Sequence, residues 1–288
     1  MDNLTTFIAA EKLFSIISDK NLILLDCRFD LAKPEWGYND YLENHIPNAI
    51  YADLDKDLSG LITSSSGRHP LPDKEKFIQK CSDWGIDQNK HVVVYDKTSG
   101  SFAARLWWML RYYNHQNVSI LDGGLQAWVE KQYPIAVGTV NPNPSTFTGT
   151  VDENQLITTP QLEKLLNQDS VLLIDARAPE RYHGINEPID KKAGRIPGSL
   201  NFFHQNNINT DGYLLPQKVL MEKYQQLLEN NLGSTKILYC GSGVTSCLDV
   251  AVMEYLNIPD VKLYAGSWSE WIRKDDHPVI NDSLNSEN

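Results

Sequence analysis

The sequence has few cysteines, no surplus of positive charge and no long apolar run. Four Cys in 288 residues are too few for a disulfide framework, and none forms a close pair with metal-ligand spacing, so we expect reduced thiols. A net charge of −11 argues against a nucleic-acid partner, because phosphate binding depends on clustered Lys and Arg. No segment approaches the roughly 18 consecutive apolar residues that a membrane helix needs. We therefore expect a soluble protein without a membrane partner.

The start of the chain shows no targeting signal. It reads MDNLTTFIAAEKLF, without a basic region before an apolar run and without an Arg-rich amphipathic stretch, so the predicted location is the cytoplasm. What the chain does have is a hydrophobic fraction of 41%, with 7 Trp and 13 Tyr, which favours a well-packed globular protein. Because 288 residues are about twice the usual domain length, we expect two domains.

Both halves of the chain carry the same series of signals, which indicates an internal duplication. Each half begins with an apolar run that predicts a buried strand ending at Asp26 in NLILLDCR or at Asp175 in SVLLIDAR. An Ile-Pro turn and a short strand follow, in ENHIPNAIYADL and AGRIPGSLNFFH. The third pair of blocks predicts a strand, a small-residue loop and a helix, in HVVVYDKTSGSFAARLWWMLRYY and TKILYCGSGVTSCLDVAVMEYL. The last pair reads VSILDGGLQAWVEKQYPI and VKLYAGSWSEWIRKDDHPV.

This alternation of strands and helices predicts the fold class. Successive βα units favour an α/β fold, here with two tandem domains that each contain a mostly parallel sheet flanked by helices. The stretch GTVNPNPSTFTGTVDENQ is rich in Pro, Gly, Thr and Asn and has no helical periodicity, which is typical of an interdomain linker. We place the domains at 1–138 and 157–288, with the linker at 139–156.

The two copies differ at one chemically important position. Asp96 in YDKTSGS stands opposite Cys240 in YCGSGVTS, where a strand ends and a loop leads into a helix. Such a loop presents free backbone N–H groups and the positive end of a helix dipole, so it stabilises an anion. The pKa of Cys240 should therefore lie below the free value of about 8.5, which makes the thiolate a nucleophile at neutral pH. Gly241 and Gly243 allow the backbone to curl around the sulfur.

Two other interpretations of Cys240 compete with this one. The first is an ordinary buried thiol at a strand end, which is the commoner role of a Cys. The glycine-rich loop and the exchange for Asp96 argue against it. The second is a cysteine-dependent phosphatase, which needs an Arg at the sixth position after the Cys to grip the phosphoryl group. That position holds Ser246, so a loop that holds a sulfur atom is favoured.

With these segments in view, the chain resembles the tandem rhodaneses, the thiosulfate and mercaptopyruvate sulfurtransferases, over nearly its whole length. CGSGVTSC is similar to the active loop of the mercaptopyruvate type. LDGGLQAW and LYAGSWSEW resemble the segments that close the family's domains, and HIPNA and RIPGS resemble its paired Ile-Pro-Gly signatures. The family's N-terminal domain is catalytically silent, which agrees with Asp96 in place of a thiol.

The resemblance also implies residues that bind the donor. Arg181 in DARAPERYHG matches the family's substrate-binding Arg, which contacts the anionic end of the donor. The matching stretch EPIDKKAG lacks the second Arg of mercaptopyruvate enzymes, and Lys191 or Lys192 is left as its replacement, although a Lys does not reproduce a bidentate grip. The loop positions expected to bind substrate are Gly241, Gly243, Val244, Thr245 and Ser246.

Mercaptopyruvate members of the family also use a Ser, a His and an Asp near the sulfur. Ser242 matches the loop Ser, His69 in GRHPLP matches the His before Leu-Pro, and Asp55 in ADLDKD matches the Asp, with Asp53 as its alternative. The His is expected to relay a proton to the enolate that remains when mercaptopyruvate loses sulfur.

Together the residues and the resemblance imply a double-displacement sulfurtransferase. The Cys240 thiolate attacks a small anionic donor, mercaptopyruvate or thiosulfate, and becomes a persulfide. The persulfide then passes sulfur to cyanide, a thiol or a thioredoxin-like protein. No metal or organic cofactor is implied. The alternative function is a non-catalytic sensor of sulfide or persulfide, or an adaptor, on the same fold.

Overall fold

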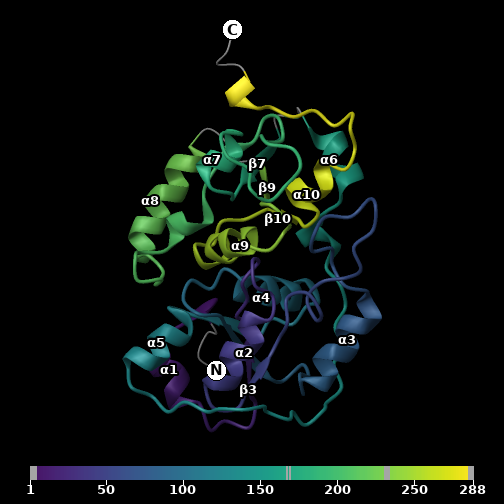
Figure 1. The fold of residues 1–288 in the computed structure, drawn as a ribbon. Coiled ribbons are helices and arrows are strands. Elements are labelled where there is room, and N and C mark those ends of the chain that lie inside the picture. Colours follow the sequence, from purple (N-terminus) through teal and green to yellow (C-terminus); the bar gives the residue numbers. More distant parts are fainter. Residues whose placement is uncertain (1–4, 167, 169, 230–233, 285–288) are drawn as a thin grey trace. The chain divides into compact units, whose positions relative to one another are not determined.

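The computed structural model describes residues 5–166, 168, 170–229 and 234–284, and the chain forms two compact units (Figure 1). The first unit comprises Met1–Gly60, Leu71–Asp152 and Ile208–Leu214, and the second comprises Leu61–Pro70, Glu153–Asn207 and Leu215–Asn288. Within the described ranges, no helix combines the length and the apolarity that crossing a membrane requires.

A five-stranded parallel sheet organises the first unit, in the order β1-β5-β4-β2-β3. The strands are β1 (Phe7–Ile8), β2 (Leu22–Asp26), β3 (Ala49–Tyr51), β4 (His91–Tyr95) and β5 (Val118–Leu121). The helices are α1 (Ala10–Ser15), α2 (Trp36–Glu43), α3 (Lys74–Asp83), α4 (Ala103–Tyr112) and α5 (Gly124–Glu130). Strand β2 pairs with β4 as far as Asp26 opposite Tyr95, so both residues lie at the carboxyl edge of the sheet.

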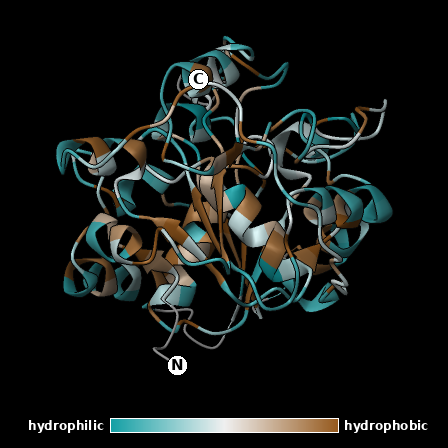
Figure 2. Ribbon diagram, turned by 90° about the horizontal axis from the view of Figure 1, so that it is seen from below, coloured by the Kyte–Doolittle hydropathy of each residue, from teal (hydrophilic) through white to brown (hydrophobic). Residues whose placement is uncertain are grey.

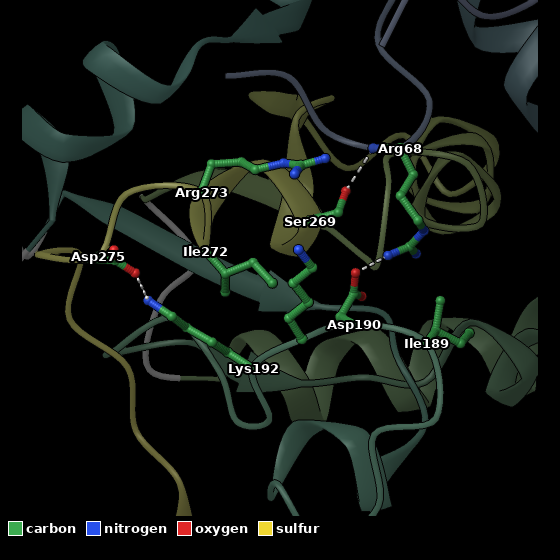
Figure 3. Close-up of a pocket in the computed structure, with 9 residues that line it drawn as sticks. Arg68, Ile189, Asp190, Lys192, Ser269, Ile272, Arg273 and Asp275 are labelled. Atoms are coloured by element: carbon green, nitrogen blue, oxygen red, sulfur yellow. Dashed lines mark hydrogen bonds and ion pairs between the residues drawn. The ribbon is translucent and has the colours of Figure 1, made fainter. Parts of the chain in front are cut away.

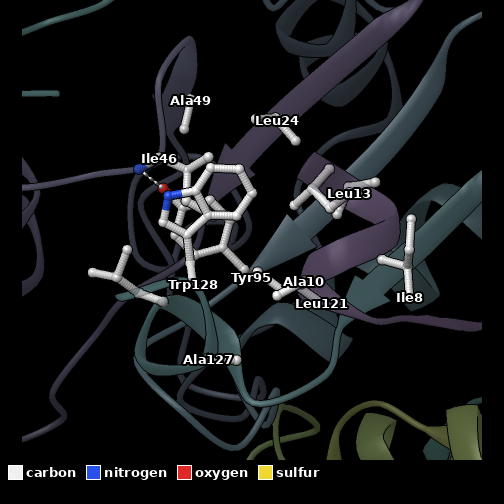
Figure 4. Close-up of a cluster of buried hydrophobic side chains, with 12 residues drawn as sticks. Ile8, Ala10, Leu13, Leu24, Ile46, Ala49, Tyr95, Leu121, Ala127 and Trp128 are labelled. Atoms are coloured by element: carbon white, nitrogen blue, oxygen red, sulfur yellow. Dashed lines mark hydrogen bonds between the residues drawn. The ribbon is translucent and has the colours of Figure 1, made fainter. Parts of the chain in front are cut away.

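Hydrophobic side chains cover both faces of this sheet. On one face, Leu13 of α1 and Trp128 of α5 pack against Val93 and Tyr95 of β4 (Figure 4). Successive strand residues point to opposite faces of a sheet, so Val92 and Val94 of β4 face the other side. Helix α4 contacts both β4 and β5. The strands are accordingly mostly hydrophobic along their length, whereas the helices carry hydrophilic residues as well (Figure 2), as expected for a buried parallel sheet.

The second unit repeats this architecture, with a parallel sheet in the order β6-β10-β9-β7-β8. Its strands are β6 (Leu156–Ile157), β7 (Val171–Asp175), β8 (Leu200–Asn201), β9 (Thr235–Tyr239) and β10 (Val261–Tyr264). Its α-helices are α6 (Thr159–Leu165), α7 (Pro179–Tyr182), α8 (Gln217–Leu228), α9 (Ser246–Tyr255) and α10 (Ser267–Trp271). Its described residues also form the 3₁₀ helices η1 (Glu153–Gln155), η2 (His204–Asn207) and η3 (Asp282–Leu284). The predicted α/β class, with two domains on parallel sheets, is confirmed.

A buried ion pair at the same place in each sheet reflects the duplication. The Asp26 carboxylate accepts hydrogen bonds from Nε of Arg28 at 3.0 Å and from its Nη2 at 2.7 Å. The Asp175 carboxylate accepts the matching bonds from Arg177 at 3.0 and 2.6 Å. All four side chains are at most 1% exposed. The Asp-x-Arg pattern at the end of the second strand of each unit therefore forms the same buried ion pair in both units.

Two short segments belong to a different unit from the residues on either side of them in the sequence. Residues 61–70 group with the second unit and residues 208–214 with the first. The backbone N–H of Arg68 donates to Ser269 Oγ at 3.0 Å, and that of Leu214 donates to Asp122 Oδ1 at 2.7 Å. The predicted domain boundaries, 1–138 and 157–288 with a linker at 139–156, stay a prediction. They describe continuous stretches of chain and therefore do not account for residues 61–70 and 208–214.

Candidate active site

Cys240 lies in a short loop at the carboxyl edge of the second sheet. Strand β9 ends one residue before it, and α9 begins at Ser246. The carboxyl ends of parallel strands are where α/β proteins bind their ligands. The backbone of Cys240 is held on both sides, because its N–H donates to Ser267 Oγ at 3.1 Å and its carbonyl accepts from the N–H of Trp268 at 3.0 Å. The residue is 2% exposed.

The corresponding loop of the first unit, which is one residue longer, holds a carboxylate at the position of the thiol. The buried carboxylate of Asp96 accepts hydrogen bonds from four backbone N–H groups of its own loop and of the start of α4. The donors are Thr98, Gly100, Phe102 and Ala103, at 3.1, 2.9, 2.9 and 3.3 Å. The duplicated loop is therefore an anion-binding nest. In the second unit, the thiol of Cys240 takes the place of the carboxylate.

The loop favours the thiolate form of Cys240. Burial raises the pKa of this thiol, but the neighbouring hydroxyls of Ser246 and Thr245 and the N–H groups of Ser246 and Ser242 stabilise the anion, outweigh burial and lower the pKa to about 7. The other thiols with a clear shift move in the opposite direction. Burial raises the pKa of both Cys27 and Cys81. The loop thus favours the anionic form of Cys240, as its position between a strand and the start of a helix predicts.

This difference predicts how Cys240 responds to pH. Its alkylation by iodoacetamide should follow the thiolate fraction, rising with pH through a midpoint at about pH 7, so that roughly a tenth of the full rate remains one pH unit lower. Peptide mass spectrometry gives the rate for each cysteine, and Cys27 and Cys81 serve as internal controls that should stay unmodified. A midpoint at about pH 8.5 or above, the value of a free thiol, would show that the loop does not stabilise the anion.

Gly243 is required by the path of the loop. Its φ is +73°, and a Cβ added there would lie 2.2 Å from the carbonyl oxygen of Ala265. An L side chain would therefore clash with the turn that follows β10. Val244 and Ser246 are buried beside it, and Ser246 starts α9 with its N–H directed at the sulfur.

Ser267 is a site residue that the sequence analysis did not single out. Its φ is +55°, a conformation that costs energy for any residue except Gly. Its hydroxyl donates to the carbonyl of Tyr264 at 2.9 Å while it accepts the N–H of Cys240. The corresponding position of the first unit is Gly124, with φ +57°. The signal in the sequence is this exchange of Gly for Ser in the copy that also has the thiol.

The structure brings His69 and Ser242 together. His69 Nδ1 lies 2.7 Å from Ser242 Oγ, and both side chains are buried. His69 reaches this position because residues 61–70 belong to the second unit. Since Ser242 also directs its N–H at Cys240, the imidazole is linked through one hydroxyl-bearing residue to the nucleophile. The imidazole and the Ser242 hydroxyl can exchange a proton with each other.

Two guanidinium groups lie beside the loop. Arg181 Nε donates to both carboxylate oxygens of Glu187 at 3.0 Å, and its Nη2 donates to Asp190 at 2.9 Å. Arg68 forms an ion pair with the same Asp190. A Cβ at Gly241 would lie 2.8 Å from Arg68 Nη2 and 3.3 Å from Arg181 Nη1. Arg68 precedes His69 in GRHPLP, but nothing in its type or spacing marks it before the loop is placed.

Asp55 lies in the first unit, and its role stays a prediction. Its N–H donates to Asp53 Oδ1 at 2.9 Å, and Asp53 also pairs with Lys56 at 3.1 Å. Burial and the charge of Asp53 raise the pKa of Asp55. The alternative candidate, Asp53, is engaged in contacts within its own turn.

Lys191 and Lys192 line a pocket of about 330 Å³ in the second unit (Figure 3). The ammonium group of Lys192 forms an ion pair with Asp275 at 2.9 Å. In Figure 3 this pair lies on the opposite side of the pocket from Arg68. The replacement of a second Arg by Lys191 or Lys192 stays a prediction.

Comparison with known proteins relates both units to one family. The family described as rhodanese-like domain matches twice, at residues 9–131 and 158–274. A Pseudomonas aeruginosa protein named probable 3-mercaptopyruvate sulfurtransferase is 40% identical over 274 residues, covering 94% of this chain and 96% of that protein. Human 3-mercaptopyruvate sulfurtransferase is 33% identical over 91% of this chain and 89% of its own length. Rat thiosulfate sulfurtransferase is 34% identical, with coverage of 88% and 86%.

Solved structures agree with the sequence relatives. The crystal structure of SseA from Escherichia coli, described as a 3-mercaptopyruvate sulfotransferase, has a TM-score of 0.81 at 29% identity and covers 92% of this chain and 99% of that one. The 3-mercaptopyruvate sulfurtransferase from Leishmania major has a TM-score of 0.83 at 27% identity, with coverage of 93% and 74%. The resemblance to tandem rhodaneses is thus confirmed. The chain belongs to the rhodanese-like domain family, as a member that contains the domain twice.

Proposed function

We propose that this chain is a sulfurtransferase in which Cys240 takes up a sulfur atom as a persulfide and passes it to an acceptor. The observation that carries the proposal is a buried thiol with a pKa lowered to about 7, in a loop whose duplicate holds a carboxylate on four N–H groups. Relatives at 33 to 40% identity that bear sulfurtransferase names support the same reaction.

In the first half-reaction the Cys240 thiolate attacks the donor sulfur. With mercaptopyruvate, the new S–S bond forms as the C–S bond breaks, and its electron pair remains on carbon as the enolate of pyruvate. The thiol proton of the donor passes to that carbon, and the linked pair His69 and Ser242 provides its route. With thiosulfate, the leaving group is sulfite and no proton moves. The loop N–H groups stabilise the persulfide anion in both cases.

In the second half-reaction an acceptor nucleophile attacks the outer sulfur. Cyanide leaves as thiocyanate and a thiolate leaves as a persulfide, and each regenerates the Cys240 thiolate. Cyanide, a small thiol and a thioredoxin-like protein are the acceptors we propose, and mercaptopyruvate is the proposed donor, with thiosulfate as the alternative. Because all four cysteines are free thiols, a reducing compartment such as the cytoplasm suits the protein.

One observation favours a second function. Cys240 is only 2% exposed, which suits a sensor or adaptor that holds sulfide or a persulfide without turning it over. The two functions differ in whether a donor and an acceptor together give multiple turnovers, because a sensor forms the adduct once and stops.

Steady-state kinetics with each donor and cyanide test the proposal. We expect thiocyanate to form over many turnovers and the ratio of kcat/KM values to identify the donor. With donor alone, the peptide that contains Cys240 should gain the mass of one sulfur atom, and cyanide should remove it. A stable sulfur adduct without turnover would establish the sensor instead, and no adduct with either donor would exclude both functions.

A further inference from the structure

Asp249 is a buried carboxyl group in the helix that follows the loop of Cys240, and the function described so far gives it no role. It is the fourth residue of α9 and is 0% exposed. Its Oδ1 accepts a hydrogen bond from Nδ2 of Asn207 at 2.6 Å and lies 3.2 Å from the hydroxyl oxygen of Tyr224. Its Oδ2 is buried without a hydrogen-bond partner among the residues that the structure describes.

This environment favours the protonated form of Asp249. An ionised carboxylate is rarely buried unless a cation or several donors compensate its charge. The side chains that bear most on Asp249 are an amide, a phenol and the thiol of Cys240. Burial raises the pKa of Asp249 well above its ordinary value, hydrogen bonds from Asn207 and Tyr224 lower it by less, and the negative charge of Cys240 raises it further. The acid is therefore neutral while Cys240 is a thiolate, because two anions at the start of one helix repel each other.

The hydrogen bonds also place the proton of this acid. The amide of Asn207 is fixed in orientation, because its Nδ2 also donates to the carbonyl of His204 at 2.9 Å and its Oδ1 accepts from the hydroxyl of Tyr224 at 3.0 Å. Oδ1 of Asp249 thus faces a donor and serves as the carbonyl oxygen of the acid, which leaves the proton on Oδ2. A buried O–H group without an acceptor is costly, so this proton needs a partner.

Ser246 is the residue placed to accept that proton in a hydrogen bond. It stands three residues before Asp249 in α9, and helical residues three apart are neighbours on one face. Helical side chains lean toward the N-terminus of their helix, so Asp249 leans toward Ser246. Ser246 Oγ is itself buried without a hydrogen-bond partner in the described part of the chain. Its hydroxyl is also one of the groups that stabilise the anion of Cys240.

We propose that Asp249 is a positioning residue of the sulfur-transfer site, a neutral acid whose Oδ2–H donates to Ser246 Oγ and so directs the Ser246 hydroxyl hydrogen at the sulfur of Cys240. The assignment rests on the proposed sulfurtransferase function and deepens it. A hydroxyl that accepts a hydrogen bond becomes a stronger donor, so these two bonds in series stabilise both the thiolate and the persulfide anion. The acid keeps its proton throughout and touches neither donor nor acceptor.

Two substitutions test the neutral acid. Asp249→Asn keeps the shape, an acceptor for Asn207 and an N–H donor for Ser246, so the alkylation midpoint of Cys240 should stay within about 0.3 pH unit of its native value of about 7. Asp249→Leu has a similar volume and no donor, and its midpoint should rise by about one pH unit, which lowers the alkylation rate below both midpoints about 10-fold. The pH profile of kcat/KM should shift with it. Had Asp249 been an anion, both substitutions would instead lower the midpoint, because a negative charge beside the thiolate would be removed.

A double-mutant cycle tests the link through Ser246. In a Ser246→Ala background, Asp249→Leu should move the midpoint by less than about 0.3 pH unit, because the hydroxyl through which the acid acts is absent. A full shift in that background would show that Asp249 acts by another route and would overturn the assignment. Urea unfolding of each variant shows whether it is folded under the assay conditions.

An infrared measurement tests the acid even where Asp249→Leu fails to fold. The native chain at neutral pH should show the C=O stretching band of a protonated carboxyl group, and Asp249→Asn should lack it. If the two spectra did not differ in this band, Asp249 would not be a neutral acid and the proposal would be wrong.

Alkylation and infrared spectra do not depend on turnover, so they separate this proposal from the proposed function. If the native chain turned over neither donor yet the midpoints shifted as expected, the hydrogen bonds from Asp249 to Ser246 would stand and the sulfurtransferase proposal would fail. If turnover occurred but folded Asp249→Leu kept the native midpoint, Asp249 would have no part in the site.

Discussion

Replacement of Cys240 by serine is expected to abolish sulfur transfer from either donor, with a loss in kcat of about 10³-fold or more. The reason is that only a thiolate can form the persulfide, and a serine hydroxyl stays protonated at neutral pH even in a loop that lowers the pKa of Cys240 to about 7. The measurement is thiocyanate formation from each donor with cyanide, beside the mass of the peptide that contains residue 240.

Cys247→Ser is the matched control, because it removes a buried thiol from α9, the helix that follows the loop of Cys240. Its Sγ donates to the carbonyl of Gly243 at 3.4 Å, a contact that a serine hydroxyl can keep, so the activity of this variant should stay within a few-fold of native. If Cys240→Ser retained native turnover, the nucleophile would lie elsewhere. If Cys247→Ser lost as much activity as Cys240→Ser, the loss could not be assigned to the nucleophile.

The second large effect concerns the silent copy of the loop. Asp96→Ala should lower the free energy of unfolding by about 2 to 4 kcal/mol, since four backbone N–H groups lose their acceptor and each of the two in buried hydrogen bonds, those of Gly100 and Ala103, costs about 1 kcal/mol or more when unpaired. Urea unfolding of the full chain measures the loss. Hydrogen exchange at the amides of Phe102 and Ala103 should accelerate first, because these amides lose their acceptor directly.

Asp19→Ala provides the comparison. The exposed carboxylate of Asp19 accepts a single bond, from the N–H of Asn21 at 2.8 Å, so its removal should cost less than about 1 kcal/mol. Similar losses for Asp19→Ala and Asp96→Ala would mean that the loop does not depend on its anion. The hydrogen bonds to Asp96 would then not support the proposal that the loop of the second unit stabilises a persulfide anion.

The two copies of the loop differ in the group that their backbone N–H groups surround. In the first unit a carboxylate is built into the nest and satisfies its N–H groups permanently. In the second unit a loop that is one residue shorter surrounds a thiol and favours its anionic form. Duplication followed by divergence at Asp96 and Cys240 therefore left one loop structural and the other suited to chemistry, on the same arrangement of strand, loop and helix.

The fold was accessible from the sequence because its signals are local. Apolar runs such as HVVVY and TKILY predict buried strands wherever they occur, and their alternation with helical patterns permits few α/β topologies. The same holds for Cys240, since a thiol between a strand and a helix start meets the local N–H groups of its own loop. Its lowered pKa depends on residues within six positions of it, so the pattern was sufficient to predict it.

The sequence by itself determined the two α/β domains, the family, the nucleophile and its loop, because each depends on contacts between near neighbours in the chain. Only the tertiary structure decided which distant side chains reach that loop. Residues 61–70 cross to the second unit and bring His69 to Ser242 and Arg68 to Gly241. Arg68, whose guanidinium lies beside Gly241, stands 113 positions before Arg181 in the chain. Periodicity and spacing carry no information about such a contact, because it is made by the packing of a loop without regular structure.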